Sequence, residues 1–200
     1  MRKNIPAHPN PPEDLNEREL PLTNQSGPWL RIHKSKHGAI HFAREAFNRF
    51  DDPKKEYGVL YCAEDFYAAF IETLGWSTGC RDISEKSLST RRLASITSSR
   101  ALQFVNLTGS GLAHIGADAE ICTVRYRYLS QQWSRALWAH PAQPDGICYI
   151  SRHDPQKVCY TLFERTAVEL NVTDLGQLNS SSLIKEVGQI IAHYKFALIN

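Results

Sequence analysis

The segment GICYISRHDPQKVCYTLFE, residues 146–164, indicates the fold most directly. Its two apolar runs, 146–152 and 158–164, are rich in the β-branched and aromatic residues that favour strands. Between them stands HDPQK, in which Asp154 and Pro155 supply the chemistry of a turn. We therefore expect two neighbouring strands joined as a hairpin.

Outward from this hairpin, other short segments show the periodicity of strands or helices. Strands are expected at WLRIH (29–33), GVLYCAED (58–65), RRLASITSS (91–99), QFVNLTG (103–109) and KFALI (195–199). Helices are expected at DFYAAFIETLG (65–75), within the region from Leu112 to His140, and from the serines at 180–182 to about His193. A chain of 200 residues with these elements fits a single domain.

The first 28 residues differ from the rest in composition. They hold six of the chain's ten prolines, a density that disfavours a regular helix or a central strand. We therefore divide the chain into a Pro-rich N-terminal arm, 1–28, and a catalytic domain, 29–200.

Composition excludes several classes of protein. A net charge of +2 is too small for a nucleic-acid footprint, so no direct nucleic-acid contact is expected. No apolar run follows the N-terminal basic residues, and no segment is long enough to span a membrane, so we expect a cytoplasmic protein without membrane contact. The five cysteines form no CxxC pair and are interpreted as reduced thiols.

Two familiar binding motifs are incomplete. His114 stands where the dinucleotide fingerprint needs its third glycine, which argues against a Rossmann site. His33, His37 and His41 are spaced by four, as metal ligands on one helix face would be, but Gly38 and the strand-like neighbours argue against a continuous helix. No metal site is expected.

A serine hydrolase is also disfavoured. Ser151, His153 and Asp154 have the residue types of a catalytic triad, yet neighbours on one strand point to alternate faces. No GxSxG elbow accompanies them.

What remains is a scattered polar set near predicted strand ends and in the helix that follows one of them. On that helix Glu72 lies on the side that carries Ala68 and Ala69, where a carboxylate can face either water or a shallow cleft. Singly, each member has an ordinary structural explanation. The set is Arg31, Arg49, Tyr61, Glu72, Ser151 and Arg152.

Taken together, these residues and their surroundings resemble the RES domain, a family named for Arg, Glu and Ser positions. The segments that carry the resemblance are WLRIH, FNRFDDP, GVLYCAEDFYAAFIETL, LTGSGLAHIGA, DGICYISRHDP and VCYTLFER, in one order between about residues 29 and 165. Family members often begin close to the first Arg, so the Pro-rich arm is a departure from the pattern.

The resemblance implies an α+β fold like that of ADP-ribosyltransferases, with a mixed sheet core and flanking helices. It implies an enzyme that takes NAD as substrate, with no resident cofactor, and cleaves the nicotinamide–ribose bond by phosphorolysis or hydrolysis. It also implies a toxin paired with an Xre-family antitoxin. Protein ADP-ribosylation and a non-catalytic module that binds NAD or ADP-ribose stay open as alternatives, as does a homodimer.

The chemistry of NAD suggests a role for each residue of the set. Cleavage makes the ribose cationic, and a single carboxylate, Glu72, can stabilise that charge. Arg31, and after it Arg49, can bind the pyrophosphate through two parallel hydrogen bonds. Tyr61 can stack on nicotinamide or orient the ribose, and Ser151 can donate a hydrogen bond to a phosphate or to the carboxamide.

The residues do not identify the group that attacks the ribose. If inorganic phosphate is the acceptor, Arg152 or His153 beside Ser151 can help to hold it.

Overall fold

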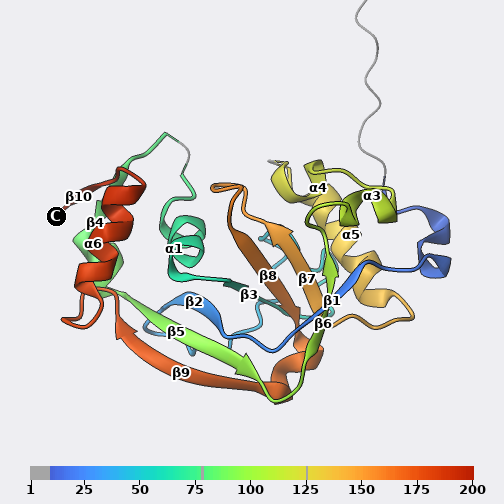
Figure 1. Cartoon of the computed structure of the whole chain (residues 1–200), viewed down its shortest axis with the longest axis horizontal. Helices are drawn as coiled ribbons and strands as arrows, with labels where there is room; N and C mark the ends of the chain where they lie inside the picture. The colour runs from blue at the N-terminus through green and yellow to red at the C-terminus, as the bar shows by residue number, and fades with distance from the viewer. Residues whose placement is uncertain (1–9, 78, 125) are drawn as a thin grey trace, which may run out of the picture.

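The computed structural model describes residues 10–77, 79–124 and 126–200 and shows one large mixed sheet with helices at both ends (Figure 1). All neighbouring strands pair antiparallel except β6 and β7, which pair parallel. The strand order is β1 (Leu22–Gln25), β6 (Leu102–Asn106), β7 (Gly146–Ile150), β8 (Val158–Phe163), β3 (Val59–Ala63), β2 (Trp29–Lys34), β5 (Arg91–Ser98) and β9 (Leu170–Gln177).

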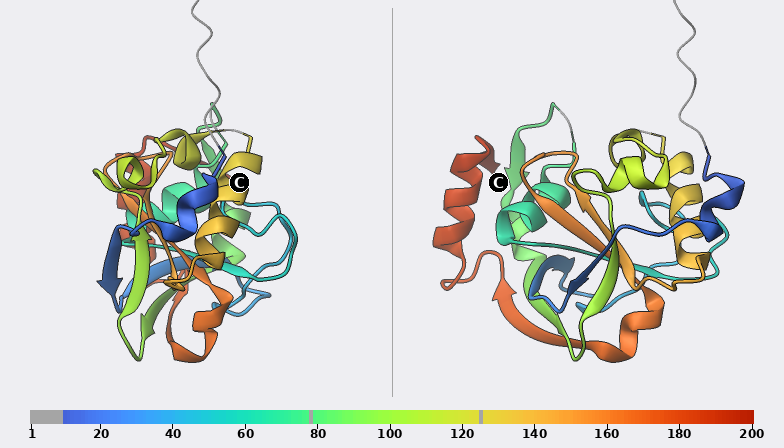
Figure 2. Two further views of the ribbon diagram at one scale, coloured as in Figure 1. Left: turned by 90° about the vertical axis from the view of Figure 1, so that its right-hand side faces the viewer. Right: turned by 45° about the vertical axis from the view of Figure 1, so that its right-hand side comes forward.

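Helices cover the two ends of this sheet (Figures 1 and 2). Helices α1 (Phe66–Leu74) and α6 (Ile184–His193) lie at one end, and α3 (Gly111–Ile115), α4 (Glu120–Thr123) and α5 (Tyr128–Ala139) lie at the other. A small parallel sheet of β4 (Asp82–Ser84) and β10 (Ala197–Ile199) stands beside α2 (Glu85–Ser89) and α6. Two 3-10 helices, η1 (Glu13–Glu17) and η2 (Glu164–Glu169), complete the described elements. The predicted α+β class is confirmed.

The predicted hairpin is β7 and β8, paired along the whole of β7 from Gly146↔Leu162 to Ile150↔Val158. The other predicted strands and the helices at both ends of the sheet also form. The structure divides the predicted helical region 112–140 into α3, α4 and α5, because Gly116 takes a left-handed φ of 79° and ends the first of them.

The N-terminal segment joins the sheet as an edge strand. Residues 22–25 pair with β6, and the prolines before and after them stand outside the paired run, as proline requires. The boundary between arm and domain at residue 28 stays a prediction. Residues 1–9 of the arm lie outside the described part of the chain.

The sheet opens between β2 and β3, and this opening is where the pocket forms. The two strands pair at Leu30↔Ala63 and then separate, whereas β2 pairs with β5 over six positions. On that side of β3, Val59 forms an isolated antiparallel bridge with Ala43, and the backbone groups between Val59 and Ala63 have no strand of the described chain beside them. One of them, the carbonyl of Tyr61, accepts a hydrogen bond from Arg31 Nη1 at 2.9 Å instead.

Candidate active site

A pocket of about 500 Å³ occupies the opening between β2 and β3. The two strands contribute its floor, and α1 contributes one wall through residues three or four positions apart, the spacing of a single helix face. These wall residues are Ala69, Glu72 and Thr73, and Trp76 lines the pocket just beyond the end of α1. Glu72 thus faces the pocket rather than open water, which decides between the two orientations that the sequence allowed.

The fold builds this wall through a capped helix. The Asp65 side chain accepts a hydrogen bond from the backbone N–H of Ala68 at 2.8 Å, which starts α1 directly after β3. Phe66 and Phe70 then bury the opposite side of the helix. Because that side is fixed in the core, Glu72 is directed toward the pocket.

Ser151 lies behind Glu72 and not on the pocket surface. Its side chain is buried, and Oγ donates to Glu72 Oε1 at 2.5 Å while accepting the backbone N–H groups of His153 and Asp154, both at 3.1 Å. The hydroxyl is therefore fully used within the protein. In this arrangement it orients the carboxylate, and the predicted hydrogen bond from Ser151 to substrate stays untested.

Tyr61 lines the pocket with its ring while its hydroxyl is engaged on the far side. The hydroxyl donates to Asp51 Oδ1 and accepts the backbone N–H of Phe50, both at 2.9 Å. Burial, together with the charge of Asp51, raises the pKa of Tyr61 well above its ordinary value. Both predicted roles of Tyr61, stacking on nicotinamide and orienting the ribose, stay predictions.

Asp51 is buried and organises the loop that carries Arg49. Its Oδ2 accepts the backbone N–H groups of Phe47 and Asn48 at 3.0 and 2.7 Å. Arg49 donates to the carbonyl of Val124 at 2.8 Å and lines the pocket. Asp51 pairs with backbone N–H groups and with Tyr61. It therefore does not neutralise the positive charge of Arg49.

Arg31 is a largely buried cation. Nη1 donates to the Tyr61 carbonyl, and Nε has no hydrogen-bond partner among the described residues. Burial lowers the pKa of the guanidinium, as expected where the charged form loses water. None of the ion pairs found in the described part of the chain includes Arg31. A buried guanidinium without an anion is costly, so this position favours a negatively charged ligand.

The charges around the pocket are mostly positive. Among the described lining residues Glu72 is the single carboxylate, and it faces a larger basic set. The basic residues are Arg31, His41, Arg49, Arg127, Arg152 and His153. The pKa of Arg49 is lowered by burial and by the charge of Arg152, against opposing effects of Tyr149, Cys122 and Glu72.

Sequence reasoning missed two aromatic residues and one arginine at the pocket. Phe47 and Trp76 are 65% and 66% exposed and line it, so two large rings face solvent beside the basic groups. The guanidinium of Arg127 lies over the Phe47 ring, 4.7 Å from its centre. The run RYRYL, residues 125–129, alternates Arg with Tyr, and this concentration of basic and aromatic residues is the sequence signal that could have indicated Arg127.

The thiols and histidines add no metal site. Among the described residues, no group of three or more His, Cys, Asp or Glu could hold a metal ion. Cys62 and Cys159 line the pocket floor, and burial raises the pKa of Cys62 to about 12. Burial thus disfavours the thiolate, which is the reactive form of cysteine.

The structure thus brings the predicted residues together. Six of them reach one pocket, and Ser151 stands directly behind the carboxylate. Those that line the pocket are Arg31, Arg49, Tyr61, Glu72, Arg152 and His153.

Comparisons with known proteins agree with this architecture. The model of the RES domain family matches residues 28–179. A relative described as "Probable toxin y4kH" of Sinorhizobium fredii (strain NBRC 101917 / NGR234) is 31% identical over 106 residues, which is 53% of this chain and 81% of that protein. A solved structure of the M. tuberculosis MbcT–MbcA toxin–antitoxin complex superposes with a TM-score of 0.66 at 18% identity, covering 88% of this chain and 97% of that one. The last similarity is one of fold.

Proposed function

The chain belongs to the RES domain family, and we propose that it cleaves the nicotinamide–ribose bond of NAD and acts as the toxin of a toxin–antitoxin pair. Its substrate is NAD and its partner an Xre-family antitoxin. The residues of the pocket support this reaction through the charges that they offer.

The observation that carries the proposal is the pairing of buried, unneutralised arginine with a single oriented carboxylate. Arg31 offers a guanidinium without an anion, and Arg49 lies in the same pocket with its pKa lowered by burial. A dinucleotide supplies the missing anion as its pyrophosphate. Once the pyrophosphate is bound, Glu72 is the one pocket carboxylate that can meet positive charge on the ribose.

The mechanism needs one carboxylate. As the bond to nicotinamide breaks, its electrons leave with nicotinamide as a neutral molecule, and the ribose becomes an oxocarbenium ion. Glu72 stabilises that ion electrostatically, and Ser151 holds the carboxylate in place beforehand so that no reorganisation is needed at the moment of reaction. The acceptor then bonds to the anomeric carbon and loses its proton.

Two acceptors are compatible with the pocket. Water gives ADP-ribose, and inorganic phosphate gives ADP-ribose 1″-phosphate. Arg152 is exposed and lines the pocket beside His153, so an anion can reach it from solvent. This location favours phosphate over water.

The test is NAD turnover by purified protein with and without phosphate, with nicotinamide and the ribose product measured by chromatography. We expect Glu72→Gln, which keeps the shape of the side chain, to lower kcat by about a hundredfold or more while the fold is retained. Glu186→Gln, an exposed carboxylate in the first turn of α6, is the matched control and should be as active as wild type.

The same pair of variants tests the toxin assignment in cells. Expression of the wild-type chain and of Glu186→Gln should stop growth unless the antitoxin is supplied, and expression of Glu72→Gln should not. Full NAD cleavage by folded Glu72→Gln would remove the proposed role of Glu72. No nicotinamide release by folded wild type would reject NAD hydrolysis and phosphorolysis and leave protein ADP-ribosylation or a binding module.

A further inference from the structure

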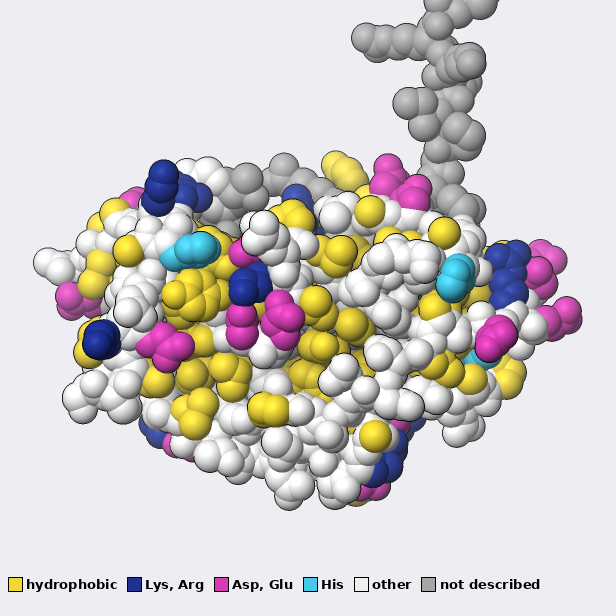
Figure 3. All heavy atoms as spheres, in the orientation of Figure 1, with side chains coloured by type: hydrophobic (Ala, Val, Ile, Leu, Met, Phe, Trp, Pro, Cys, Tyr) yellow, Lys and Arg dark blue, Asp and Glu magenta, His cyan; other side chains and the backbone are white. Residues whose placement is uncertain are grey.

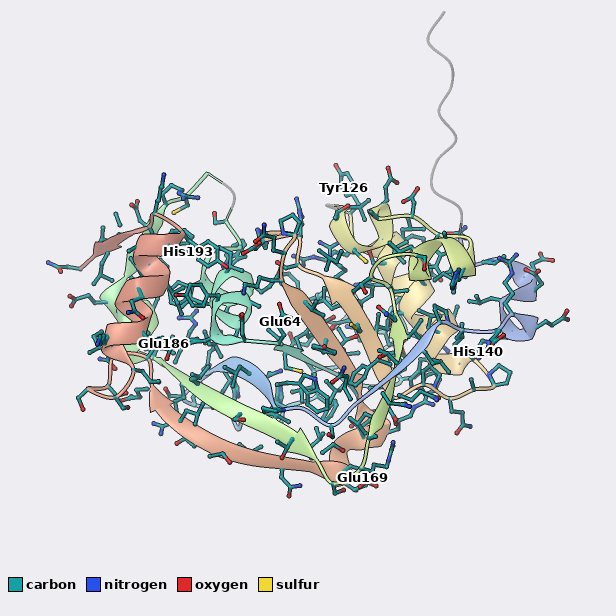
Figure 4. All side chains as sticks on the ribbon, viewed as in Figure 1. Glu64, Tyr126, His140, Glu169, Glu186 and His193 are labelled. Atoms are coloured by element: carbon teal, nitrogen blue, oxygen red, sulfur yellow. The ribbon has the colours of Figure 1, made fainter. Side chains whose placement is uncertain are left out.

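The C-terminal helix lies beyond the family match, which ends at residue 179, yet it packs against the helix that carries Glu72. Val187 and Ile190 of α6 are buried in the same apolar cluster as Phe66 and Phe70 of α1. Figure 4 shows His193 near the end of α6, on the side toward α1. In Figure 3, hydrophobic side chains gather over the region where these two helices meet.

The aromatic residues at the end of α6 extend this contact. The Tyr67 ring of α1 meets the rings of His193 and Tyr194 at 5.2 and 6.2 Å between centres. The chain therefore holds Tyr194 against Tyr67, a residue of α1 that is not among those lining the pocket.

From this position Tyr194 reaches the turn of the β7–β8 hairpin. Its hydroxyl donates to Asp154 Oδ2 at 2.9 Å. The backbone N–H of Asp154 donates to Ser151 Oγ at 3.1 Å, and Ser151 Oγ donates to Glu72 Oε1 at 2.5 Å. Hydrogen bonds on both the side chain and the backbone of Asp154 thus link Tyr194, at the end of α6, to the pocket carboxylate through Ser151.

A second anchor holds the other side of the same turn. Lys157 pairs with Asp65 at 2.5 Å and its ammonium lies 5.6 Å from the centre of the Tyr67 ring. This anchor acts where β8 begins. The Tyr194 hydroxyl holds the side chain of Asp154, and the backbone N–H of Asp154 donates to Ser151 Oγ. The Tyr194 contact therefore fixes the part of the turn nearest to Glu72.

We propose that Tyr194 is a positioning residue, which through Asp154 and Ser151 fixes the direction of the Glu72 carboxylate in the pocket. The proposal rests on the proposed function of Glu72. Tyr194 then supports the active site from a segment that the family match does not include. A preoriented carboxylate stabilises the transition state without affecting how tightly the substrate binds.

The first test is Tyr194→Phe, which removes the hydroxyl and keeps the ring packed on Tyr67. We expect kcat for nicotinamide release to fall about tenfold with KM unchanged, because orientation and not binding is lost. Tyr67→Phe is the matched control, since the described residues give the Tyr67 hydroxyl no hydrogen bond, and it should leave kcat at the wild-type value. A wild-type kcat in Tyr194→Phe, or an equal loss in both variants, overturns the proposal.

A double-mutant cycle tests the path itself. If Tyr194 acts through Ser151, then Tyr194→Phe should cause no further loss in a Ser151→Ala background. A second tenfold loss in that background would mean that Tyr194 acts by another route and would reject the proposal.

Hydrogen exchange tests the role of Tyr194 without an activity measurement, so it separates this proposal from the proposed function. If the wild-type protein cleaves no NAD, the proposed function is wrong. Hydrogen exchange then still tests whether Tyr194 holds the turn that carries Ser151. We expect the amides of His153 and Asp154, which donate to Ser151 Oγ, to exchange about tenfold faster in Tyr194→Phe than in wild type. Equal exchange in the two proteins overturns the positioning role.

Discussion

Arg31 illustrates how a buried, unpaired charge can lower the stability of a protein. Its guanidinium reaches the carbonyl of Tyr61 across the open sheet, but Nε is left without a partner. A methionine of similar length would fill the same space without a charge to desolvate. The residue is therefore better explained by a ligand than by the fold.

We expect Arg31→Met to raise the free energy of unfolding by about 1 kcal/mol, because relief of desolvation outweighs the lost bond to Tyr61. Urea unfolding monitored by fluorescence measures it. Arg92→Met, which removes a partly exposed arginine paired with Asp174, is the control and should change stability by less than about 1 kcal/mol. A clear loss of stability in Arg31→Met would show that the residue serves the fold.

At the scale of elements, the strand and helix patterns predicted where most of the candidate site residues lie. The remaining feature, a hydrogen bond between two of them, depends on the geometry of a turn. Alternation within WLRIH and GVLYCAED placed Arg31 and Tyr61 on strands, and the helix after the second strand placed Glu72. The hydrogen bond between Ser151 and Glu72 could not be predicted. It depends on how the hairpin turn directs one hydroxyl, and no periodic pattern encodes that direction.

The strand β9 shows a different limit. Its sequence LNVTDLGQ contains Asn, Asp and Gly, which are poor strand formers, and no strand was predicted there. It forms because β5 offers an unpaired edge, and Gly176 with a φ of 112° accompanies the register shift at Leu93 and Ala94. Tertiary pairing overrides local propensity at this position.

The loop from Asp51 to Tyr57 joins the site to α5 through a buried carboxylate. Asp52 accepts Arg135 Nη1 at 2.8 Å and the backbone N–H groups of Lys54 and Glu56 at 3.2 and 2.6 Å. Burial raises the pKa of Asp52, but these hydrogen bonds outweigh it and hold the pKa below its ordinary value of 3.8. The folded state therefore favours the ionised form.

Because the folded pKa is depressed, the stabilisation by Asp52 is fully present above pH 3.8 and is lost as the pH falls through the folded value. We expect Asp52→Asn to lower the free energy of unfolding by about 2 kcal/mol at neutral pH, and the difference from wild type to shrink in acid. Urea unfolding as a function of pH checks this. Asp14→Asn, at an exposed pair with Arg18, should show neither effect, and a difference for Asp52→Asn that is independent of pH would contradict the assignment.

At the scale of the whole molecule, the net charge is small, but basic side chains are concentrated in the pocket. The chain carries a net charge of only +2, while its pocket gathers four arginines and two histidines around one carboxylate. Among the described residues no helix is long and apolar enough to cross a membrane. Like charges held together in an empty pocket repel one another and oppose folding, and a bound anion relieves that repulsion.

A pyrophosphate ligand should therefore stabilise the entire fold. We expect ADP-ribose at a hundredfold excess over its Kd to add about 2.7 kcal/mol to the free energy of unfolding and to raise Tm by several degrees. Adenosine, which lacks the pyrophosphate, should give no comparable shift at the same concentration. Arg31→Met should lose most of the ADP-ribose effect while Arg92→Met keeps it, and thermal unfolding of the three proteins measures all of these outcomes. If ADP-ribose stabilised Arg31→Met as much as wild type, the pyrophosphate would have to bind elsewhere, because the loss of a buried guanidinium from its binding site cannot leave the affinity unchanged.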